Sequence, residues 1–355
     1  MITATKPLPV PSFYKAKNAE EWSYEPNEAG LLTEGDAWGK KHGIRPAGSD
    51  KAKVHLLLID VQKDFCYPKG TLYVGGRKGD GAIEDSKRTA EFIYKNLGRI
   101  SDITCTMDSH FRYQIFFPDF WLTKDDGPVA PHTVITADMV KAGDVKPNMA
   151  IAKFICNGNY GWLVDYAKHY CSTLEKAGKY KLYVWPYHCL MGTVGHTLVG
   201  VIEEARAFHQ TIRKNMGRPQ IKGGHFLTEN YSVLSPEVMT DHTGKPLKEA
   251  QKNVELIRTL IESDYVVIAG QAASHCVKSS IDDLLSAITA QDPKLTKKVY
   301  IMEDCMSAVA VPDGKGGFYA DFTPQAEDAL KKFADAGMHV VKSTTPMEDW
   351  EGLNL

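Results

Sequence analysis

The chain has 355 residues, of which 43% are hydrophobic and 24% charged, and its formal net charge is -2 at pH 7. This length suits one large α/β domain with additions, or two domains. The near-zero charge offers no basic surplus to neutralise phosphates, so we expect no nucleic-acid partner. The sequence has no apolar run of about 18 residues, and residues 1–17 lack the apolar stretch of a signal peptide, so we expect neither a membrane span nor a secretory signal.

The cysteines indicate the cellular compartment. Seven is an odd number, and no CxxC pair occurs among them. This pattern favours reduced thiols in a cytoplasmic protein over a disulfide framework or a structural zinc ribbon. The seven are Cys66, Cys105, Cys156, Cys171, Cys189, Cys276 and Cys305.

Residues 1–50 combine proline, glycine and polar residues without a sustained hydrophobic period. We predict an irregular N-terminal arm that wraps the domain or a neighbouring subunit. Residues 51–345 then form the main domain, and residues 346–355 form a C-terminal tail.

The main domain begins with a continuous apolar run at 54–61, which is typical of a central parallel strand buried on both faces. Further apolar runs predict strands at 102–107, 181–185, 265–270, 298–302 and 338–343. Apolar residues at helical spacing predict helices at 81–97, 197–216, 249–263, 274–290 and 324–336. This alternation predicts an α/β fold whose doubly wound, mostly parallel sheet lies between two helical layers. In such sheets ligands bind at the carboxyl ends of the strands.

Residues 111–180 interrupt the alternation with a stretch rich in aromatic residues, proline and glycine. A segment of this length inside a compact domain is usually functional or a small subdomain, so we predict an insertion that carries one helix at 160–176. We expect four of its aromatic residues to close a pocket or to bury against a second subunit. The alternative is a small satellite core away from any substrate. The four are Phe116, Phe117, Phe120 and Trp121.

Reactive side chains follow several of the predicted strands. Asp60 ends the first apolar run, where a carboxylate is costly to bury unless it is paired or used; the alternative is a cap of the following turn. Asp108 and His110 stand at positions i and i+2 after the second strand, so in extended backbone they point to the same side and can converge on one ion. The alternative for this pair is a solvated loop. His188 would complete an open three-ligand site that suits Zn, Fe or Mn better than Ca.

Cys276 follows the buried strand at 265–270 and a tight Gly/Ala turn, where the next helix is predicted to begin. Helix N-termini present free amide N–H groups and a positive dipole end, which lower the pKa of a thiol and can stabilise an oxyanion. The alternative is an inert buried thiol, which we expect for the other six cysteines. His275 is adjacent, but neighbouring residues at a helix start point in different directions, so it need not be a base.

Five motifs occur in one order along the chain: DVQKDF, MDSH, WPYHC followed by GTVG, IKGG with ENYS beyond it, and GQAASHCV. Together they resemble the motif series of nicotinamidases, within the isochorismatase-like cysteine hydrolases. The series covers about residues 54–345, with the 111–180 insertion inside it and the N-terminal arm outside it. The resemblance implies the three-layer, isochorismatase-like α/β/α fold.

The resemblance also implies a catalytic triad of Asp60, Lys222 and Cys276. Asp60 would take the thiol proton and Lys222 would bias both ionisations. Cys276 would attack an amide carbonyl, which gives ammonia and a thioester that water hydrolyses. The oxyanion hole would be the backbone N–H groups of Ala272 and Cys276, with a cis peptide bond between Gln271 and Ala272.

The same resemblance implies one divalent metal ion that anchors a pyridine nitrogen or orients water. The expected ion is Zn, with Fe or Mn as alternatives. Its ligands would be Asp108, His110 and His188. The substrate ring would lie between Phe65 and Trp185, with Tyr231 beside them.

Three departures surround this pattern. Gln114 stands where the family often has a further histidine, AASHC replaces the usual residues before the nucleophile, and GGHFLTENYS is longer and more polar than the usual segment. The leading interpretation is hydrolysis of nicotinamide to nicotinate and ammonia by a cytoplasmic homo-oligomer. The alternatives are the same chemistry on another small amide or carbamoyl compound, a catalytically silent binding protein, and a vinyl-ether hydrolase, which Cys276 and WPYHC disfavour.

Overall fold

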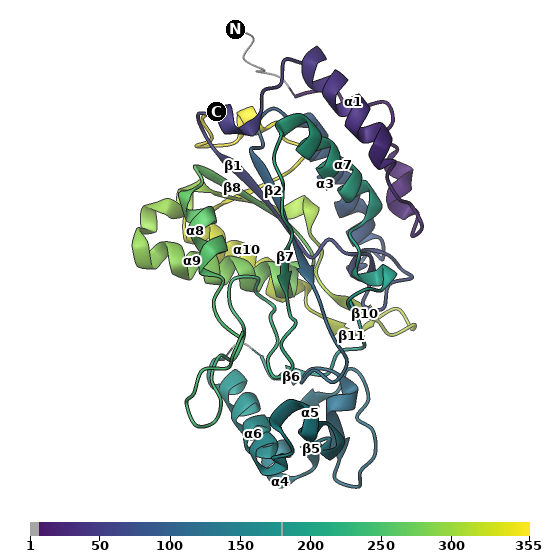
Figure 1. Cartoon of the computed structure of the whole chain (residues 1–355), viewed down its shortest axis with the longest axis vertical. Coiled ribbons are helices and arrows are strands. Elements are labelled where there is room, and N and C mark those ends of the chain that lie inside the picture. The colour runs from purple at the N-terminus through teal and green to yellow at the C-terminus, as the bar shows by residue number, and fades with distance from the viewer. Residues whose placement is uncertain (1–6, 179) are drawn as a thin grey trace.

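The computed structural model describes residues 7–178 and 180–355. Its central sheet has six strands in the order β12-β9-β8-β1-β2-β7, and every pairing within it is parallel (Figure 1). The strands are β1 (Val54–Ile59), β2 (Asp102–Asp108), β7 (Gln220–Lys222), β8 (Tyr265–Gly270), β9 (Val299–Met302) and β12 (His339–Val341). Five of these six were predicted from their apolar runs. The sixth, β7, is too short and too polar to give such a signal.

The first strand shows why the apolar runs identify the sheet. Leu57 and Ile59 of β1 belong to one hydrophobic cluster, whereas Leu56 and Leu58 belong to another on the opposite face of the sheet. All four side chains are buried. A strand covered on both faces needs apolar residues at every position, which is the pattern that predicts a doubly wound sheet.

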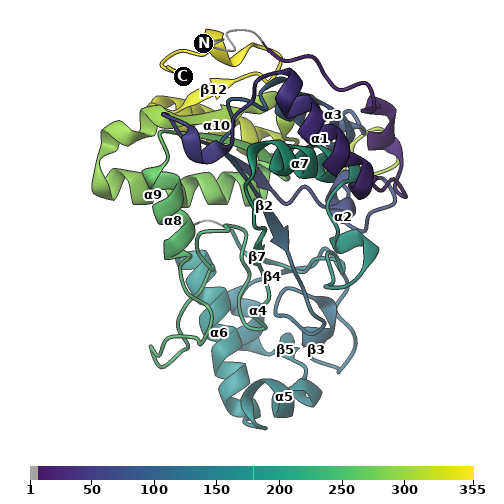
Figure 2. The ribbon, with the colours of Figure 1, turned by 45° about the horizontal axis from the view of Figure 1, so that its top comes forward.

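Helices cover both faces of the sheet, as predicted (Figures 1 and 2). One layer contains α3 (Gly81–Lys95) and α7 (Gly200–Arg213), which pack against each other. The other layer contains α8 (Val254–Glu262), α9 (Lys278–Gln291) and α10 (Thr323–Asp335). The arrangement is therefore a three-layer α/β/α fold.

The N-terminal arm is not irregular throughout, because residues Glu28–Lys41 form helix α1. Its N-cap is Asn27, whose side chain accepts a hydrogen bond from the backbone N–H of Gly30. The helix packs on α7 through glycines, with Gly35 facing Thr211. Glycine adds nothing to a hydrophobic period, so this interface was invisible in the sequence. The described part of the arm covers its own domain; residues 1–6 lie outside the described residues.

The insertion forms a lobe at the carboxyl end of the sheet (Figure 1). Its predicted helix is present as α6 (Tyr160–Lys176). The shorter elements, which are too short for a hydrophobic period, were missed. They are β3 (Trp121–Thr123), β4 (Val134–Ile135), α4 (Ala137–Ala142), β5 (Val145–Pro147) and α5 (Ala152–Cys156).

One strand lies elsewhere than expected. The apolar run at 181–185 forms β6 (Leu182–Tyr183), which pairs antiparallel with β4 of the lobe and not with the central sheet. Strand β3 pairs antiparallel with β5 in the same lobe. An apolar run predicts a strand, but the partner of that strand depends on tertiary contacts.

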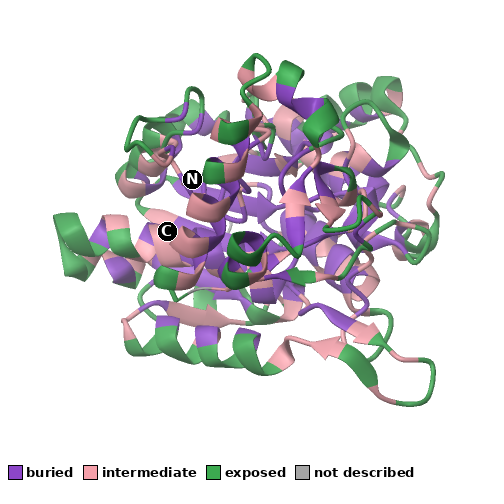
Figure 3. Cartoon of the chain, turned by 90° about the horizontal axis from the view of Figure 1, so that it is seen from below, coloured by how far each residue is buried: buried purple, intermediate pink, exposed green. Residues whose placement is uncertain are grey.

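The four lobe aromatics Phe116, Phe117, Phe120 and Trp121 are fully buried. They belong to the same hydrophobic cluster as Leu57 and Ile59 of β1, so the lobe shares its core with the main domain. Figure 3 shows this continuous buried interior, with exposed residues around it. The expected burial against a second subunit is therefore wrong, and so is a detached satellite core.

The remaining elements are short. A four-residue helix, α2 (Lys63–Cys66), follows β1, and a hairpin joins β10 (Ala310–Pro312) to β11 (Phe318–Asp321). A π-helical turn (Ala273–Val277) stands between β8 and α9. Short 3-10 helices lie at Ala16–Glu20, Ala47–Ser49, Pro118–Phe120, Met149–Ile151, Val194–His196, Pro293–Lys298, Glu303–Cys305 and Met347–Asp349. Within the described residues, none of the helices combines the length and apolar character needed to cross a membrane.

Candidate active site

Four side chains named from the sequence meet at the carboxyl edge of the sheet. Asp60 directly follows β1, Asp108 ends β2 and Lys222 ends β7, while Cys276 lies in the π-helical turn after β8. These strands are neighbours in the order β8-β1-β2-β7. Parallel strands end at the same edge, so residues far apart in the sequence converge there. All four side chains are buried.

Lys222 stands at the centre of this group. Its Nζ lies 2.9 Å from Oδ2 of Asp60, 3.0 Å from Oδ1 of Asp108 and 3.7 Å from Sγ of Cys276. Burial alone would lower the pKa of Lys222, but the charges of Asp108 and Asp60 outweigh it and raise that pKa well above its ordinary value. The lysine therefore remains an ammonium ion between two carboxylates and the thiol.

The two oxygens of Asp60 have different partners, a hydroxyl and an ammonium. Thr106 donates its hydroxyl to Oδ1, and the backbone N–H of Asp60 donates to the same hydroxyl oxygen at 3.0 Å. The buried Oδ2 is held in the ion pair with Nζ of Lys222 at 2.9 Å. Burial raises the pKa of Asp60, and Lys222 partly offsets this. A buried acceptor of this kind is suited to receiving a proton.

Cys276 lies beside that acceptor. One oxygen from each of Asp60 and Asp108 and the sulfur of Cys276 all lie within 4.8 Å of one another. Burial raises the pKa of the Cys276 thiol well above its ordinary value, although Lys222 opposes the shift. The thiol therefore keeps its proton in the resting site, and a nearby base must remove that proton if the sulfur is to act as a nucleophile. The other six cysteines are also free, and all but Cys156 are buried.

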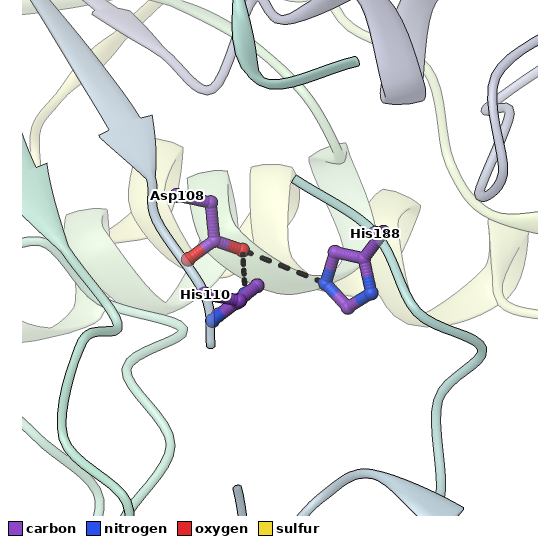
Figure 4. Close-up of side chains that lie close together, drawn as sticks. All are labelled: Asp108, His110 and His188. Carbon is purple, nitrogen blue, oxygen red and sulfur yellow. Dashed lines mark ion pairs between the residues drawn. The ribbon is translucent and has the colours of Figure 1, made fainter. Parts of the chain in front are cut away.

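Asp108 also belongs to a second cluster, which Figure 4 shows. Its Oδ2 lies 3.0 Å from Nε2 of His110 and 3.7 Å from Nε2 of His188. The Nδ1 atoms lie near backbone carbonyls, 3.1 Å from Gly223 for His110 and 2.8 Å from Pro186 for His188. Nε2 of each ring therefore faces the carboxylate, while Nδ1 faces a backbone carbonyl.

This donor set fits a divalent metal ion. One carboxylate and two imidazole nitrogens, all buried, match the three protein ligands of an open catalytic site. The carbonyls behind both histidines supply the outer hydrogen bonds that orient such ligands. Three oxygen and nitrogen donors favour a transition metal or zinc over calcium.

Gln114 does not extend the metal cluster. Its Nε2 donates to the carbonyls of Gly223 at 2.6 Å and His225 at 2.9 Å, and its Oε1 accepts from the N–H of Phe111 at 2.9 Å. The side chain is fully committed to backbone groups, so it braces the loop after β7. The described residues therefore offer three protein ligands at this cluster, Asp108, His110 and His188.

A pocket opens over both clusters and encloses about 440 Å³ of space, part of it open to solvent. The three aromatic residues expected around a substrate, Phe65, Trp185 and Tyr231, all line it. The indole N–H of Trp185 donates to the hydroxyl of Tyr231 at 2.9 Å, which fixes these two rings at an edge-to-face angle. The pocket thus offers a rigid aromatic wall beside the thiol.

The expected oxyanion region also borders the pocket. Ala272 lines it, and the peptide bond between Gln271 and Ala272 is cis, as the family resemblance implied. The carbonyl of Ala272 accepts hydrogen bonds from the backbone N–H groups of His275 and Val277, which closes the turn that carries Cys276.

The sequence reasoning missed several residues of the site. Glu229 lines the pocket, is buried, and has an Oε2 without a hydrogen-bond partner within the described residues. Burial raises the pKa of Glu229 well above its ordinary value, which favours the protonated acid. Its position in the unusually polar GGHFLTENYS segment was the available signal. Gln62 was quoted only as part of a motif, yet its side chain bonds both backbone groups of Asp108.

Removal of one metal ligand tests the second cluster. We expect His188→Ala to lose most bound divalent metal, because two ligands alone hold such an ion weakly. Elemental analysis of purified protein measures the metal content per chain. The control is His169→Ala, which removes a histidine of α6 that bonds the carbonyl of Thr240 and should leave the metal content unchanged. Undiminished metal in His188→Ala would exclude His188 as a ligand.

No protein-family model matches the chain, and a search of curated proteins finds no match. Among solved structures, a nicotinamidase/pyrazinamidase of Acinetobacter baumanii matches at 18% identity and a TM-score of 0.46, over 83% of this chain and 99% of its own. The yeast nicotinamidase bound to nicotinaldehyde matches at 19% identity and a TM-score of 0.48, over 81% of this chain and 99% of its own. An isochorismatase-like hydrolase of Alkaliphilus metalliredigens matches at 13% identity and a TM-score of 0.40, over 82% of this chain and 95% of its own. The chain is similar to these nicotinamidases and to this isochorismatase-like hydrolase, the group that its motif series resembles.

Proposed function

We propose that the chain is a metal-assisted cysteine amidohydrolase that cleaves nicotinamide to nicotinate and ammonia. One observation carries the proposal. The Cys276 thiol lies 3.7 Å from the Lys222 ammonium and within 4.8 Å of a carboxylate oxygen of Asp60, whose buried Oδ2 pairs with Lys222 at 2.9 Å. The nucleophile lines the pocket, and a base and a charge-balancing cation lie beside it, which is the arrangement that covalent amide hydrolysis needs.

The proposed reaction has two halves. Cys276 Sγ bonds to the amide carbonyl carbon while its proton passes to Oδ2 of Asp60, and the carbonyl electron pair moves onto oxygen. The backbone N–H groups of Ala272 and Cys276 stabilise that oxyanion. Its collapse breaks the C–N bond, and the leaving nitrogen takes the proton from Asp60 to depart as ammonia. Water then bonds to the thioester carbon while one of its protons passes to Asp60. Collapse of this intermediate breaks the C–S bond, the sulfur takes that proton from Asp60, and the carboxylic acid leaves.

The pocket walls favour a flat aromatic amide. Phe65 and Trp185 would hold the ring and Tyr231 would limit its edge, because all three line the pocket beside the thiol. A divalent ion held by Asp108, His110 and His188 would supply a Lewis-acid anchor for a ring nitrogen or for water. Its ligand types are compatible with Zn, and also with Fe or Mn.

A second candidate keeps the chemistry and changes the substrate. Burial of Glu229 at the pocket wall raises its pKa and favours the neutral acid, which can donate a hydrogen bond that an unsubstituted pyridine ring does not require. A small amide or carbamoyl compound with a second polar group would use this donor. The intact Asp60, Lys222 and Cys276 group argues against a silent binding protein, which needs no activated thiol.

Ammonia release from a panel of amides tests the proposal directly. The panel should contain nicotinamide, pyrazinamide, benzamide and aliphatic amides, each assayed with and without a chelator. We expect the highest kcat/KM for nicotinamide and a large loss after metal removal. A higher kcat/KM for a polar aliphatic amide would favour the second candidate, and no ammonia from any amide would contradict both.

The lobe gives a further test because the aromatic ring of Phe117 borders the metal cluster. The Phe117 ring lies 5.5 Å from the rings of both His110 and His188. We expect Phe117→Leu to weaken metal affinity by about 10–100-fold, the effect typical of groups that orient metal ligands. Metal titration of the apoprotein measures this.

The matched control is Phe120→Leu. Phe120 is an equally buried lobe phenylalanine, but its ring packs on Trp121. Both substitutions should lower stability by similar amounts, and only Phe117→Leu should change metal affinity. Equal affinities in the two variants would show that the lobe supports the fold without supporting the metal ligands.

The cytoplasmic location and the homo-oligomer also belong to this proposal. The seven free cysteines support a reducing compartment. Sedimentation of the purified chain would measure its oligomeric state, and a monomer at micromolar concentration would contradict that part of the proposal.

A further inference from the structure

A buried carboxylate that does not line the pocket lies behind the turn that carries Cys276. Asp85 of α3 is only 3% exposed. Its Oδ2 accepts hydrogen bonds from the Gln271 side-chain amide at 2.9 Å and from the Ser307 hydroxyl at 2.6 Å. Arg88 donates to its Oδ1 at 2.9 Å. One oxygen thus joins two segments that are far apart in the sequence.

The two joined segments frame the nucleophile turn. The Oε1 of Gln271 accepts from the backbone N–H of Ser307 at 3.2 Å, and the N–H of Ala273 donates to the carbonyl of Ser307 at 2.8 Å. Further along, the N–H of Val309 donates to the hydroxyl of Ser274 at 3.1 Å. Residues 271–274 are therefore joined to residues 307–309 by several hydrogen bonds, and Asp85 bonds to both segments at the buried end of this network.

Burying a carboxylate costs free energy, so the position of Asp85 needs an explanation. Its three hydrogen bonds satisfy the carboxylate. If the only need were packing, apolar residues in place of Asp85 and its partners could fill the same space without burying a charge. Asp85 accepts a hydrogen bond from Gln271, the residue directly before Ala272. This contact links the carboxylate to the donor groups of the site and not only to the core.

We propose that Asp85 is a positioning residue that holds the 271–276 turn in the shape that stabilises the oxyanion. Asp85 acts through Gln271 and Ser307 and touches no substrate. This inference rests on the proposed function, because it needs a reaction that develops negative charge on a carbonyl oxygen. The backbone N–H groups of Ala272 and Cys276 stay aimed at that oxygen only while the turn is braced.

The proposal separates two reactions of the same thiol. Amide hydrolysis creates an oxyanion and depends on the braced turn. Alkylation by iodoacetamide joins Sγ to a saturated carbon and expels iodide, so it develops no oxyanion. A residue that only positions the turn should affect the first reaction and spare the second.

The test compares Asp85→Asn with the parent chain as metal-loaded protein. We expect kcat for the best amide to fall about 10²-fold, as for loss of an oxyanion donor, with KM little changed. The rate of Cys276 alkylation should stay the same. Burial raises the pKa of Asp85 to about 6, against the hydrogen bonds from Ser307, Gln271 and Arg88, so assays at about pH 8 keep the parent carboxylate ionised.

Glu204→Gln is the matched control. Glu204 is equally buried and accepts hydrogen bonds from the hydroxyls of Tyr24 and Tyr94, but none of its bonds reaches the nucleophile turn. We expect this variant to lose thermal stability and to keep kcat. If Asp85→Asn behaves in the same way, Asp85 is a structural acid and the proposal is wrong.

Two further variants keep the test decisive. Ser307→Ala removes only one hydroxyl, so it should fold even if Asp85→Asn does not, and we expect kcat to fall about tenfold with alkylation unchanged. Gln271→Ala combined with Asp85→Asn should cost little more than either change alone, because both act on one link. Additive losses, or alkylation that slows in step with kcat, would overturn the proposal.

The parent chain distinguishes this proposal from the proposed function. A parent that releases no ammonia from any amide overturns both. A parent that is active while Ser307→Ala and Asp85→Asn retain its kcat overturns only the role of Asp85.

Discussion

Cys276→Ala is expected to abolish amide turnover while folding and metal content stay intact. The side chain lies in a buried turn, and its sulfur lies 3.7 Å from Nζ of Lys222 and within 4.8 Å of a carboxylate oxygen of Asp60. Alanine leaves a small cavity but disturbs no ligand of the metal cluster. Loss of a nucleophile that acts together with its base typically removes about 10⁶ in kcat. Ammonia release, thermal melting and elemental analysis measure the three properties.

A matched cysteine substitution controls for the cavity. Cys171→Ala removes a buried thiol of α6 in the lobe, remote from the triad in the sequence and absent from the pocket lining. It should keep kcat within a small factor of the parent. Mass spectrometry of the parent quenched during turnover should find an acyl adduct on Cys276. Substantial residual activity in Cys276→Ala would exclude the covalent mechanism.

Asp60→Asn is expected to lower kcat by about 10²–10⁴-fold, the contribution typical of a positioned base. An amide nitrogen or carbonyl in place of Oδ2 cannot accept the thiol proton. Burial raises the pKa of the Cys276 thiol, so few molecules hold a thiolate near neutral pH without a base. Alkylation of Cys276 in the variant should therefore slow near pH 7 and recover as pH rises.

The sign of this pH dependence is informative. Asp60 carries a raised pKa because of its burial, so the parent should lose kcat/KM as pH falls and the carboxylate takes up a proton. Asp60→Asn has no carboxylate at this position, so its kcat/KM should not show this decrease at low pH. Alkylation at pH 7 that is equally fast in Asp60→Asn and in the parent would show that Asp60 does not activate the thiol.

The central strands could be predicted because burial on both faces leaves a record in the sequence. Strand β8 was found at its exact limits, and helix α6 also matches its predicted range. Helix α1 left no such record, since it packs on α7 through Gly35 and Gly39. Strand β6 gave an apolar run but pairs within the lobe. Local patterns report burial, whereas pairing and glycine contacts depend on what lies opposite.

The position of Lys222 shows the same division within the site. Its motif named it, but three residues of mixed polarity gave no prediction of β7. In the structure, β7 pairs with β2 so that Lys222 is the direct partner of Asp108. This register brings the ammonium beside Asp108, and the strand order β8-β1-β2-β7 places Asp60 and Cys276 at the same edge of the sheet, beyond β2.

The sequence by itself determined the residue types that carry the chemistry, because strand-end motifs keep their order and composition whatever surrounds them. It also determined the doubly wound fold, through apolar runs that only a sheet covered on both faces requires. Only the tertiary structure decided which atoms face one another. Gln114 donates to backbone carbonyls, Glu229 lines the pocket, and Oδ2 of Asp60 pairs with Lys222. These contacts depend on small differences in distance and angle between segments that are far apart in the chain, and no local pattern encodes them.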